Sequence, residues 1–160
     1  MMKIVICIVL STSFLLFSGP TLGFLYSTEV PFEVIDSGGG YNYESRDNFI
    51  ITNSTFWENL WLFLYSGHSH PPEVPIVNFT SEILIAVFQG ERGSSGYSTN
   101  ITRIVMTIVY YVVYVDEIHP GENCGILTVM TYPYQIVKIG DHPLNLPVQF
   151  IYNITDYDCG

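Results

Sequence analysis

The chain has 160 residues, of which 48% are apolar and 15% aromatic, so it has material for one compact core but hardly for two. Only 12% of the residues are charged, against about a quarter in a typical soluble domain, which argues against a disordered chain and against a salt-bridged cytosolic surface. Fifteen acidic residues outweigh five basic ones, and the bases are not clustered, which argues against nucleic acid and anionic lipid surfaces as partners.

The N-terminus has the organisation of an export signal. Lys3 precedes an apolar run over residues 4–17, and the small residues of "GPTLG" follow it. The run is short for a bilayer span, so we predict a signal peptide over residues 1–23, cleaved after Gly23. An uncleaved membrane anchor is the alternative. In both cases residues 24–160 are expected to form a single domain outside the cytoplasm, secreted or at the cell surface.

Four N-glycosylation sequons follow, at Asn53, Asn78, Asn100 and Asn153. We expect two or three of them to carry glycans, so that sugar in place of charge keeps this surface soluble. In the last two sequons, strand alternation places Asn and Thr on the solvent face and the intervening isoleucine on the other face. The side chains predicted to point inward on these strands are Tyr97, Thr99, Ile101, Phe150, Tyr152 and Ile154.

The cysteines predict one disulfide. Cys7 lies within the predicted signal, which leaves Cys124 and Cys159. In an oxidising compartment this pair indicates a bridge that ties the C-terminal tail to the body of the domain. Closing that loop would stabilise the fold by about 3 to 4 kcal/mol on the chain-entropy estimate. The alternative is two buried free thiols.

The first predicted elements are two extended pieces and one helix. The stretch "VPFEVIDSGGGYNYES" indicates a short strand, a reversal at residues 38–40 and a second extended segment. In "NFIITNSTFWENLWLFLYSG" the period changes to that of a helix, with Asn53 as N-cap or, alternatively, Thr55 and Glu58 as a capping box, and with Gly67 as a left-handed C-terminal residue. The apolar stripe of this helix is wide enough to require packing against a sheet. It comprises Phe56, Leu60, Phe63 and Leu64, flanked by Trp57 and Trp61.

The remaining chain is predicted to be almost entirely β-structure. "SGHSHPPEVP" is a loop by its glycine and three prolines. From residue 81 onward β-branched and aromatic residues dominate, in "ILIAVFQ", "YSTNITRIVM", "IVYYVVYVDE", "GILTVMTYPY", "YQIVKIG" and "LPVQFIYNIT". The sequence therefore predicts an α+β fold, predominantly β, with one N-terminal helix packed on an antiparallel sheet, small barrel or sandwich of about six to eight strands.

Two of these strands have features that a simple surface strand lacks. "IVYYVVYV" carries tyrosines on both faces, which indicates a central strand covered on both sides or a face reserved for a partner. Pro133 cannot donate to a ladder, so it must lie at an edge, a bulge or a corner between strands. We predict that this bend displays Tyr132 and Tyr134 near each other at a sheet margin.

No pattern nominates a catalytic or metal site. All four histidines, His68, His70, His119 and His142, lie in loops that contain proline, and no acids or cysteines support them at ligand spacing. The "GSSG" at residues 93–96 lacks the spacing of a nucleophile elbow, and no carboxylate pair stands out. We therefore expect a protein without enzymatic activity, without a metal and without a cofactor.

Three consecutive stretches carry a family resemblance: "ILIAVFQGERGSSGYSTNITRI", "VVYVDEIHPGENCG" and "LTVMTYPYQIVKI". In this order they resemble the C-terminal domain of the protease complex subunit PrcB family, over residues 83–140. Upstream, "FWENLW" and "PPEVPIVNF" resemble the helix and the Pro-Pro-Glu-Val segment that often precede this domain. Ser95 stands where a glycine is usual, and Glu122 with Asn123 replaces a commoner Pro-Gly. The positions that match the family motifs are Gly90, Gly96, Tyr97, Ser98, Pro120, Gly121, Cys124, Pro133, Tyr134 and Lys138.

The resemblance implies a non-catalytic extracellular module, named for a subunit that accompanies a secreted serine protease. We hypothesise an accessory module that holds a protein partner at the margin formed by the "GSSGY" loop and the "TYPY" corner, where aromatic side chains give contact area at low entropy cost. The alternative for Tyr97 and Tyr134 is that they fill the core. The predicted binding residues are Ser95, Gly96, Tyr97, Tyr132, Pro133 and Tyr134.

Two other functions are kept as alternatives. Tyrosine-rich strands and sugar also suit a structural subunit of a cell surface or an extracellular filament, which would self-associate into large homo-oligomers. "SSGY" resembles the Thr-Thr-Gly-Tyr loop of chagasin-type cysteine protease inhibitors, which are also secreted β-rich domains. An accessory module should instead be a small monomer that brings down a distinct protein.

Overall fold

The structure, a computed structural model, describes residues 27–40, 43–141, 143 and 145–159. The predicted signal peptide and Cys7 lie outside the described residues, as does His142. Within the described stretches, no helix combines the length and the apolar character needed to cross a lipid bilayer.

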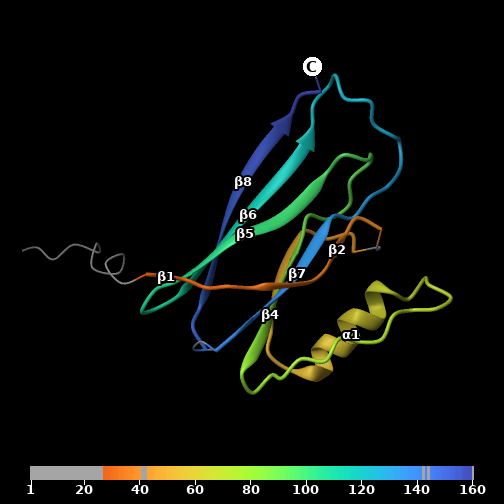
Figure 1. Ribbon diagram of the computed structural model, residues 1–160. Helices are drawn as coiled ribbons and strands as arrows, with labels where there is room; N and C mark the ends of the chain where they lie inside the picture. The colour runs from red at the N-terminus through yellow and green to blue at the C-terminus, as the bar shows by residue number, and fades with distance from the viewer. Residues whose placement is uncertain (1–26, 41–42, 142, 144, 160) are drawn as a thin grey trace, which may run out of the picture.

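The described chain forms eight strands and one helix, and the strands form two four-stranded sheets (Figure 1). Sheet A has the strand order β1-β5-β6-β8, and sheet B has the order β2-β7-β4-β3. The predicted class, α+β and predominantly β, is confirmed in the form of a sandwich, which over these residues does not close into a barrel. The elements are β1 Thr28–Glu29, β2 Glu33–Gly38, β3 Asp47–Ile51, α1 Ser54–Leu64, β4 Glu82–Phe88, β5 Ser98–Met106, β6 Tyr111–Pro120, β7 Tyr134–Gly140 and β8 Val148–Tyr157.

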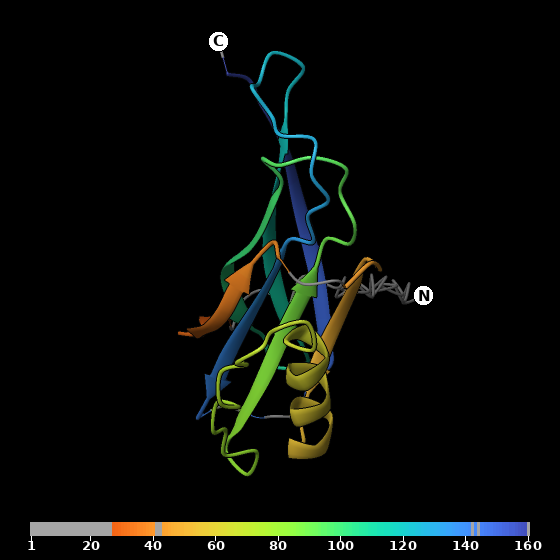
Figure 2. The same ribbon diagram turned by 90° about the vertical axis from the view of Figure 1, so that its right-hand side faces the viewer.

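Sheet B is the middle of three layers, with sheet A on one face and α1 on the other (Figures 1 and 2). Side-chain alternation on β4 directs Ile83, Ile85 and Val87 toward sheet A. The alternate residues Leu84, Ala86 and Phe88 pack in the cluster with α1. The uninterrupted apolar run of β4 follows from this position, because the strand is buried on both faces.

Helix α1 begins where the sequence predicts it. The Asn53 side chain accepts a hydrogen bond of 2.9 Å from the Phe56 backbone N–H, which satisfies one of the open amides of the first turn. The prediction for the other end is wrong. The helix ends at Leu64, and Gly67 does not have a positive φ.

The buried face of α1 is rotated relative to the predicted stripe. Phe56 and Phe63 belong to that stripe, yet they are 41% and 52% exposed. The rotation places both indole N–H groups against the segment that follows the helix, where they donate to the carbonyls of Pro75 at 2.9 Å and Pro72 at 3.1 Å. The buried residues of the helix are Trp57, Leu60, Trp61 and Leu64.

One strand pair departs from the predicted antiparallel arrangement. Strand β8 runs parallel to β6 over the whole of both strands, whereas the other pairs of named strands are antiparallel. Between them the chain passes through β7 in sheet B, so it re-enters sheet A in the direction of β6. A crossover of this kind is the connection that parallel neighbours require. Strand β6 is central in its sheet, with Tyr111, Val113 and Val115 fully buried, but its other face is not covered by a further layer of the described chain.

The segment "GILTVMTYPY", which was predicted as a strand, does not form one before β7 begins at Tyr134. Between β6 and β7 the backbone forms only two isolated bridges, Thr131 with Arg92 and Tyr132 with Gly40. The strand propensity of this segment is unused because β6 and β7, which flank it in the sequence, already have neighbours on both sides. The segment crosses from sheet A to sheet B instead.

Candidate partner-binding site

Two loops lie side by side at the end of the sandwich where β4 and β6 finish (Figure 1). The loop after β4 and the segment after β6 exchange two main-chain hydrogen bonds of 2.8 Å between Arg92 and Thr131. The Ser95 N–H donates to the Leu127 carbonyl, and the Leu127 N–H donates to Ser95 Oγ, both at 2.9 Å. The surface formed by these loops is called the loop platform, and it comprises residues 91–97 and 125–132.

Gly96 lets the platform pack against the end of β6. Its φ is +95°, a conformation that L side chains rarely adopt. A Cβ atom at this position would lie 3.0 Å from Cβ of Pro120. The predicted binding residue Gly96 therefore shapes the loop through its backbone.

Two tyrosines of the platform, Tyr97 and Tyr132, are half-buried. The Tyr97 ring centroid lies 5.3 Å from the guanidinium carbon of Arg92 and 5.2 Å from the ring of His119. The Tyr132 hydroxyl donates to the Glu91 carboxylate at 3.3 Å. Desolvation, followed by the negative charge of Glu91, raises the pKa of Tyr132 above its usual value. Both rings are thus anchored on one side and open to solvent on the other.

Pro133 and Tyr134 are buried, so they do not face a partner directly. Pro133 immediately precedes β7, at a corner between strands as predicted, and its carbonyl accepts a hydrogen bond of 2.8 Å from the Gln89 N–H. Tyr134 is 1% exposed and packs between sheet B and α1, the core position that was its alternative. Its hydroxyl donates to Asp36 Oδ2 at 2.8 Å, and that of Tyr65 donates to the same oxygen at 2.9 Å. The predicted binding residues that remain accessible are Ser95, Gly96, Tyr97 and Tyr132.

Sequence reasoning missed the most exposed apolar side chains of the platform. Ile126, Leu127, Val129 and Met130 are 45%, 71%, 48% and 49% exposed. Contiguous exposed apolar side chains are typical of a binding surface, whereas single ones are ordinary. The signal was the unbroken apolar run in "GILTVM", which fits a buried strand equally well.

A cleft of about 210 Å³ opens beside the platform, between the end of β2 and the start of β5. The first half of β5 has no strand neighbour on this side within the described chain, because β1 pairs only with Val105 and Met106. Thr99 Oγ1 is buried there and has no hydrogen-bond partner among the described residues. Tyr97 of the "GSSGY" loop and Tyr134 of the "TYPY" corner both line this cleft.

Beneath the platform, the space between the sheets is polar. Glu117 is 1% exposed, and Arg46 contacts its two carboxylate oxygens at 2.9 and 3.0 Å. The guanidinium of Arg46 also lies 4.6 Å from the ring centroid of Tyr152, which packs against the core between the sheets. His119 Nε2 is 3.9 Å from Glu117. Because Arg46 compensates the buried acid, the cluster supports this end of the sandwich as a charge-paired unit.

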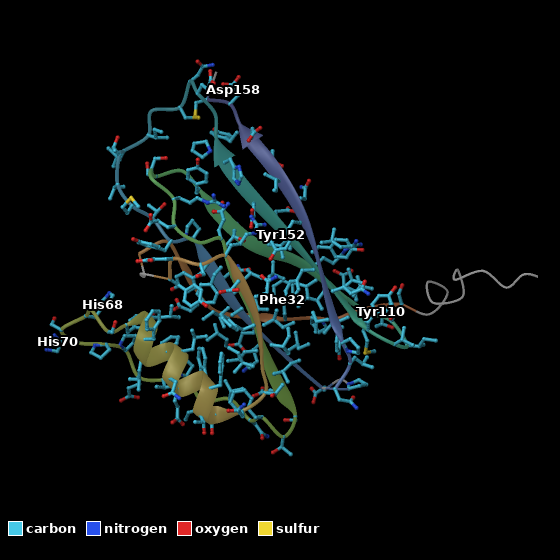
Figure 3. All side chains as sticks on the ribbon, turned by 180° about the vertical axis from the view of Figure 1, so that it is seen from behind. Phe32, His68, His70, Tyr110, Tyr152 and Asp158 are labelled. Carbon is cyan, nitrogen blue, oxygen red and sulfur yellow. A yellow bond between two sulfur atoms is a disulfide. The ribbon has the colours of Figure 1, made fainter. Side chains whose placement is uncertain are left out.

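The histidines are spread over the molecule. His68 and His70 lie in the loop beyond α1, on the side of the molecule away from sheet A (Figure 3). The ring of His68 lies 5.3 Å from the ring of Tyr65 at the end of the helix. Across the described residues, no group of three or more His, Cys, Asp and Glu side chains is placed to hold a metal ion.

The predicted disulfide joins Cys124 to Cys159, whose Cα atoms are 5.0 Å apart. It ties the segment after β6 to the chain beyond β8, next to Asp158 (Figure 3). Beside it, the Gly121 N–H donates to the Tyr157 carbonyl at 2.7 Å, and a Cβ on Gly121 would lie 2.9 Å from that oxygen. The base of the platform is therefore fixed by a covalent bond and by a close backbone contact.

The four sequons lie in two groups. Asn53 caps α1, and Asn78 accepts a hydrogen bond of 3.2 Å from the Thr80 N–H in the turn before β4. Asn100 lies on β5 and Asn153 on β8, both in sheet A. One pair thus flanks the helix layer, and the other belongs to the opposite layer of the molecule.

The predicted inward orientation on β5 and β8 is confirmed at most positions. Thr99 and Ile101 are buried, and Phe150 and Tyr152 pack against the core between the sheets. Ile154 is an exception, because its side chain is 53% exposed. The ends of β6 and β8 extend beyond sheet B (Figure 1), so no strand of sheet B covers this position.

Residues 83–140 match the family model described as PrcB C-terminal. The matched range runs from β4 through β7 and includes the whole loop platform. It coincides with the stretch on which the resemblance was stated, which confirms that resemblance. No curated protein and no solved structure matches the chain.

Proposed function

Residues 83–140 match the PrcB C-terminal family model, and from this premise we propose that the chain is an extracellular, non-catalytic accessory module that binds a protein partner through the loop platform. The class of partner that the family favours is a secreted protease. The proposal assigns binding to the family domain and leaves α1 as a cover for sheet B.

The observation that carries this proposal is a set of exposed apolar side chains on a rigid support. Leu127 is 71% exposed, although its backbone is tied to Ser95 by two hydrogen bonds. The disulfide at Cys124 fixes the same segment at its base. A surface that is already ordered loses little conformational entropy on binding, so more of the contact energy appears as affinity.

Charge favours a basic partner. Lys3 lies in the predicted signal, so residues 24–160 contain four bases and fifteen acids, a formal charge of 4 − 15 = −11. Glu91 of the platform is exposed, and so is Glu122, three residues before its second segment. Arg92 is engaged within the fold, because its guanidinium donates to the Gln89 carbonyl at 3.2 Å. A partner with apolar and Lys- or Arg-rich contacts is therefore complementary to this surface.

The test is affinity capture of the tagged, secreted protein, with mass spectrometry of the bait and of the co-eluting chains. The double variant Leu127→Asp/Met130→Asp places two charges in the centre of the exposed patch. Ile76→Asp is the matched control, because Ile76 is 95% exposed and lies outside the platform. We expect the control to retain the captured partner and the double variant to lose it. Equal retention by both variants would reject the platform as the binding surface.

A second candidate function, a self-associating structural subunit, is favoured by one observation. Strand β8 has ten residues and, within the described part of the chain, pairs on one side only, with β6, so its other edge is open to a second copy. Light scattering on the secreted protein distinguishes the two functions. An accessory module is monomeric, and a structural subunit forms large homo-oligomers.

A further inference from the structure

The outer face of sheet A is the exposed side of the sandwich. Helix α1 covers the outer face of sheet B, whereas the ribbon views show no described segment over the outer face of sheet A (Figures 1 and 2). Apolar side chains on this face reach solvent: Ile118 is 38% exposed and Ile151 is 47% exposed. Beside Ile151 in the register lies Tyr114, whose ring carries the Arg103 guanidinium at 4.1 Å. An uncovered sheet face of this composition favours association.

Two sequons lie in one row across this face. Strand register places Asn100 of β5 opposite Asp116 of β6, and Asp116 opposite Asn153 of β8. The Asn153 side-chain amide donates to Asp116 Oδ1 at 3.3 Å, on the side of the sheet away from the core. The sequon threonines, Thr102 and Thr155, are exposed. Two steps between neighbouring strands put the two asparagines about 10 Å apart.

Each sequon of this row also lies on a strand with an open edge. Among the described residues, β8 pairs only with β6. On β5, β1 reaches only Val105 and Met106, so no strand that the structure describes pairs with the edge at Asn100. Asn153 is the sixth of the ten residues of β8, close to the middle of its open edge.

Strand β8 lacks the usual protection of an open edge. Its sequence, "VQFIYNITDY", contains no proline, lysine or arginine, and its charge is the aspartate at Asp156. Long open edges without such residues pair readily with other chains. A glycan on Asn153 would stand on the face beside this edge, and a glycan on Asn100 would do the same for the open part of β5.

We infer that glycans at Asn100 and Asn153 cover the outer face of sheet A and guard its two open edges against pairing with a second copy of the chain. The inference rests on the export that the proposed function assumes. Sugar is the occupant that the register favours, because both attachment sites fall in one row on the single uncovered face of the described sandwich. The low charge of the chain means that charged side chains contribute little to keeping this face soluble.

The test compares two double variants of the secreted, glycosylated protein. Thr102→Val/Thr155→Val removes both sequons of the row and keeps the asparagines, the strand propensity and the bond between Asn153 and Asp116. Thr55→Val/Thr80→Val removes the sequons at Asn53 and Asn78 in the same manner. Light scattering should give at least twice the monomer mass for the first variant and the monomer mass for the second. Adding Ile151→Lys to the first variant should restore the monomer.

The outcomes separate this inference from the proposed function. Mass spectrometry of the exported chain gives signal cleavage and the occupancy of each asparagine in one experiment. Export with bare Asn100 and Asn153, or a first variant that remains monomeric at the same concentration, overturns the glycan guard and leaves partner binding intact. A chain that is not exported overturns both. Partner capture by the monomeric Ile151→Lys triple variant should equal that of the parent, because the platform is unchanged.

Discussion

In the described chain, sheets A and B contain four strands each, but sheet B is covered on both faces and sheet A on one. In sheet B, six consecutive residues of β4 are buried. In sheet A, no residue of β8 reaches full burial, and the strand carries a sequon. Sheet B is therefore the scaffold of the domain, and sheet A is the layer whose outer face contacts solvent. The loop platform joins the two, because its first loop leads from β4 of sheet B to β5 of sheet A, and its second segment leads from β6 of sheet A to β7 of sheet B.

The largest contrast should appear between two isoleucines. Ile85 is fully buried in β4, and Ile85→Ala should lower the free energy of unfolding by about 2 to 5 kcal/mol through lost burial and a residual cavity. Ile151 lies on the outer face of β8, and Ile151→Ala should change it by less than about 0.5 kcal/mol. Chemical denaturation of both variants measures the two values. Similar losses would contradict the assignment of sheet A's outer face to solvent.

The disulfide should have the next largest effect. Cys124→Ser/Cys159→Ser should lower the free energy of unfolding by about 3 to 4 kcal/mol, because the bridge closes a sequence separation of 35 residues. Amide hydrogen exchange should also accelerate across residues 125–132 in this variant and stay unchanged in β4. An unaltered exchange rate in that segment would mean that the main-chain bonds alone hold the platform.

Two neighbouring tyrosines sharpen the comparison further. Tyr134→Phe removes one of the two hydroxyls that donate to Asp36 and should cost about 1 to 2 kcal/mol of stability. Tyr132→Phe removes a bond to the exposed Glu91, so it should leave stability within about 0.5 kcal/mol. Thermal unfolding measures both changes in stability, and affinity capture measures how much partner each variant binds. Reduced capture is expected for Tyr132→Phe alone.

The smallest expected effect concerns pH. The Asn78 N–H donates to Glu82 at 2.8 Å, and Lys138 lies 3.4 Å away, so the backbone hydrogen bond and then the ammonium lower the pKa of Glu82 from 4.5. A lowered folded-state pKa gives stability that is complete above pH 4.5 and lost as the pH falls through the folded value. Glu82→Gln should therefore be slightly less stable than the parent at pH 6. The two should converge in strong acid, as denaturation at a series of pH values would measure.

Local features of this fold are predictable from the sequence. The helix start at Asn53 depends on residues within one turn, and the pairing of Cys124 with Cys159 follows from the count of cysteines outside the predicted signal. The corner at Pro133 follows from its missing N–H. Strands β4 and β7 are also predicted from local sequence, because each is a run of β-branched and other apolar residues with clear boundaries.

The features that were predicted wrongly depend on contacts with residues that are distant in the sequence. Which face of α1 is buried depends on the carbonyls of Pro72 and Pro75, which accept hydrogen bonds from its two indoles. The spacing of apolar residues within the helix carries no information about these carbonyls. The parallel pairing of β8 is decided by the path of β7 through the other sheet. The exposure of Leu127 has the same origin, because its strand-forming segment finds both flanking strands already paired. In the candidate site, the sequence identified the two loops, but it did not show that Tyr134 is buried while Tyr132 remains partly exposed.

Hydrogen–deuterium exchange of the captured complex tests the central claim most directly, since it reports on every segment at once. The account predicts slower exchange in residues 91–97 and 125–132 on binding, with β8 unchanged. Protection confined to residues 148–157, with the platform exchanging as in the free protein, would contradict it and would identify the open edge of sheet A as the binding surface.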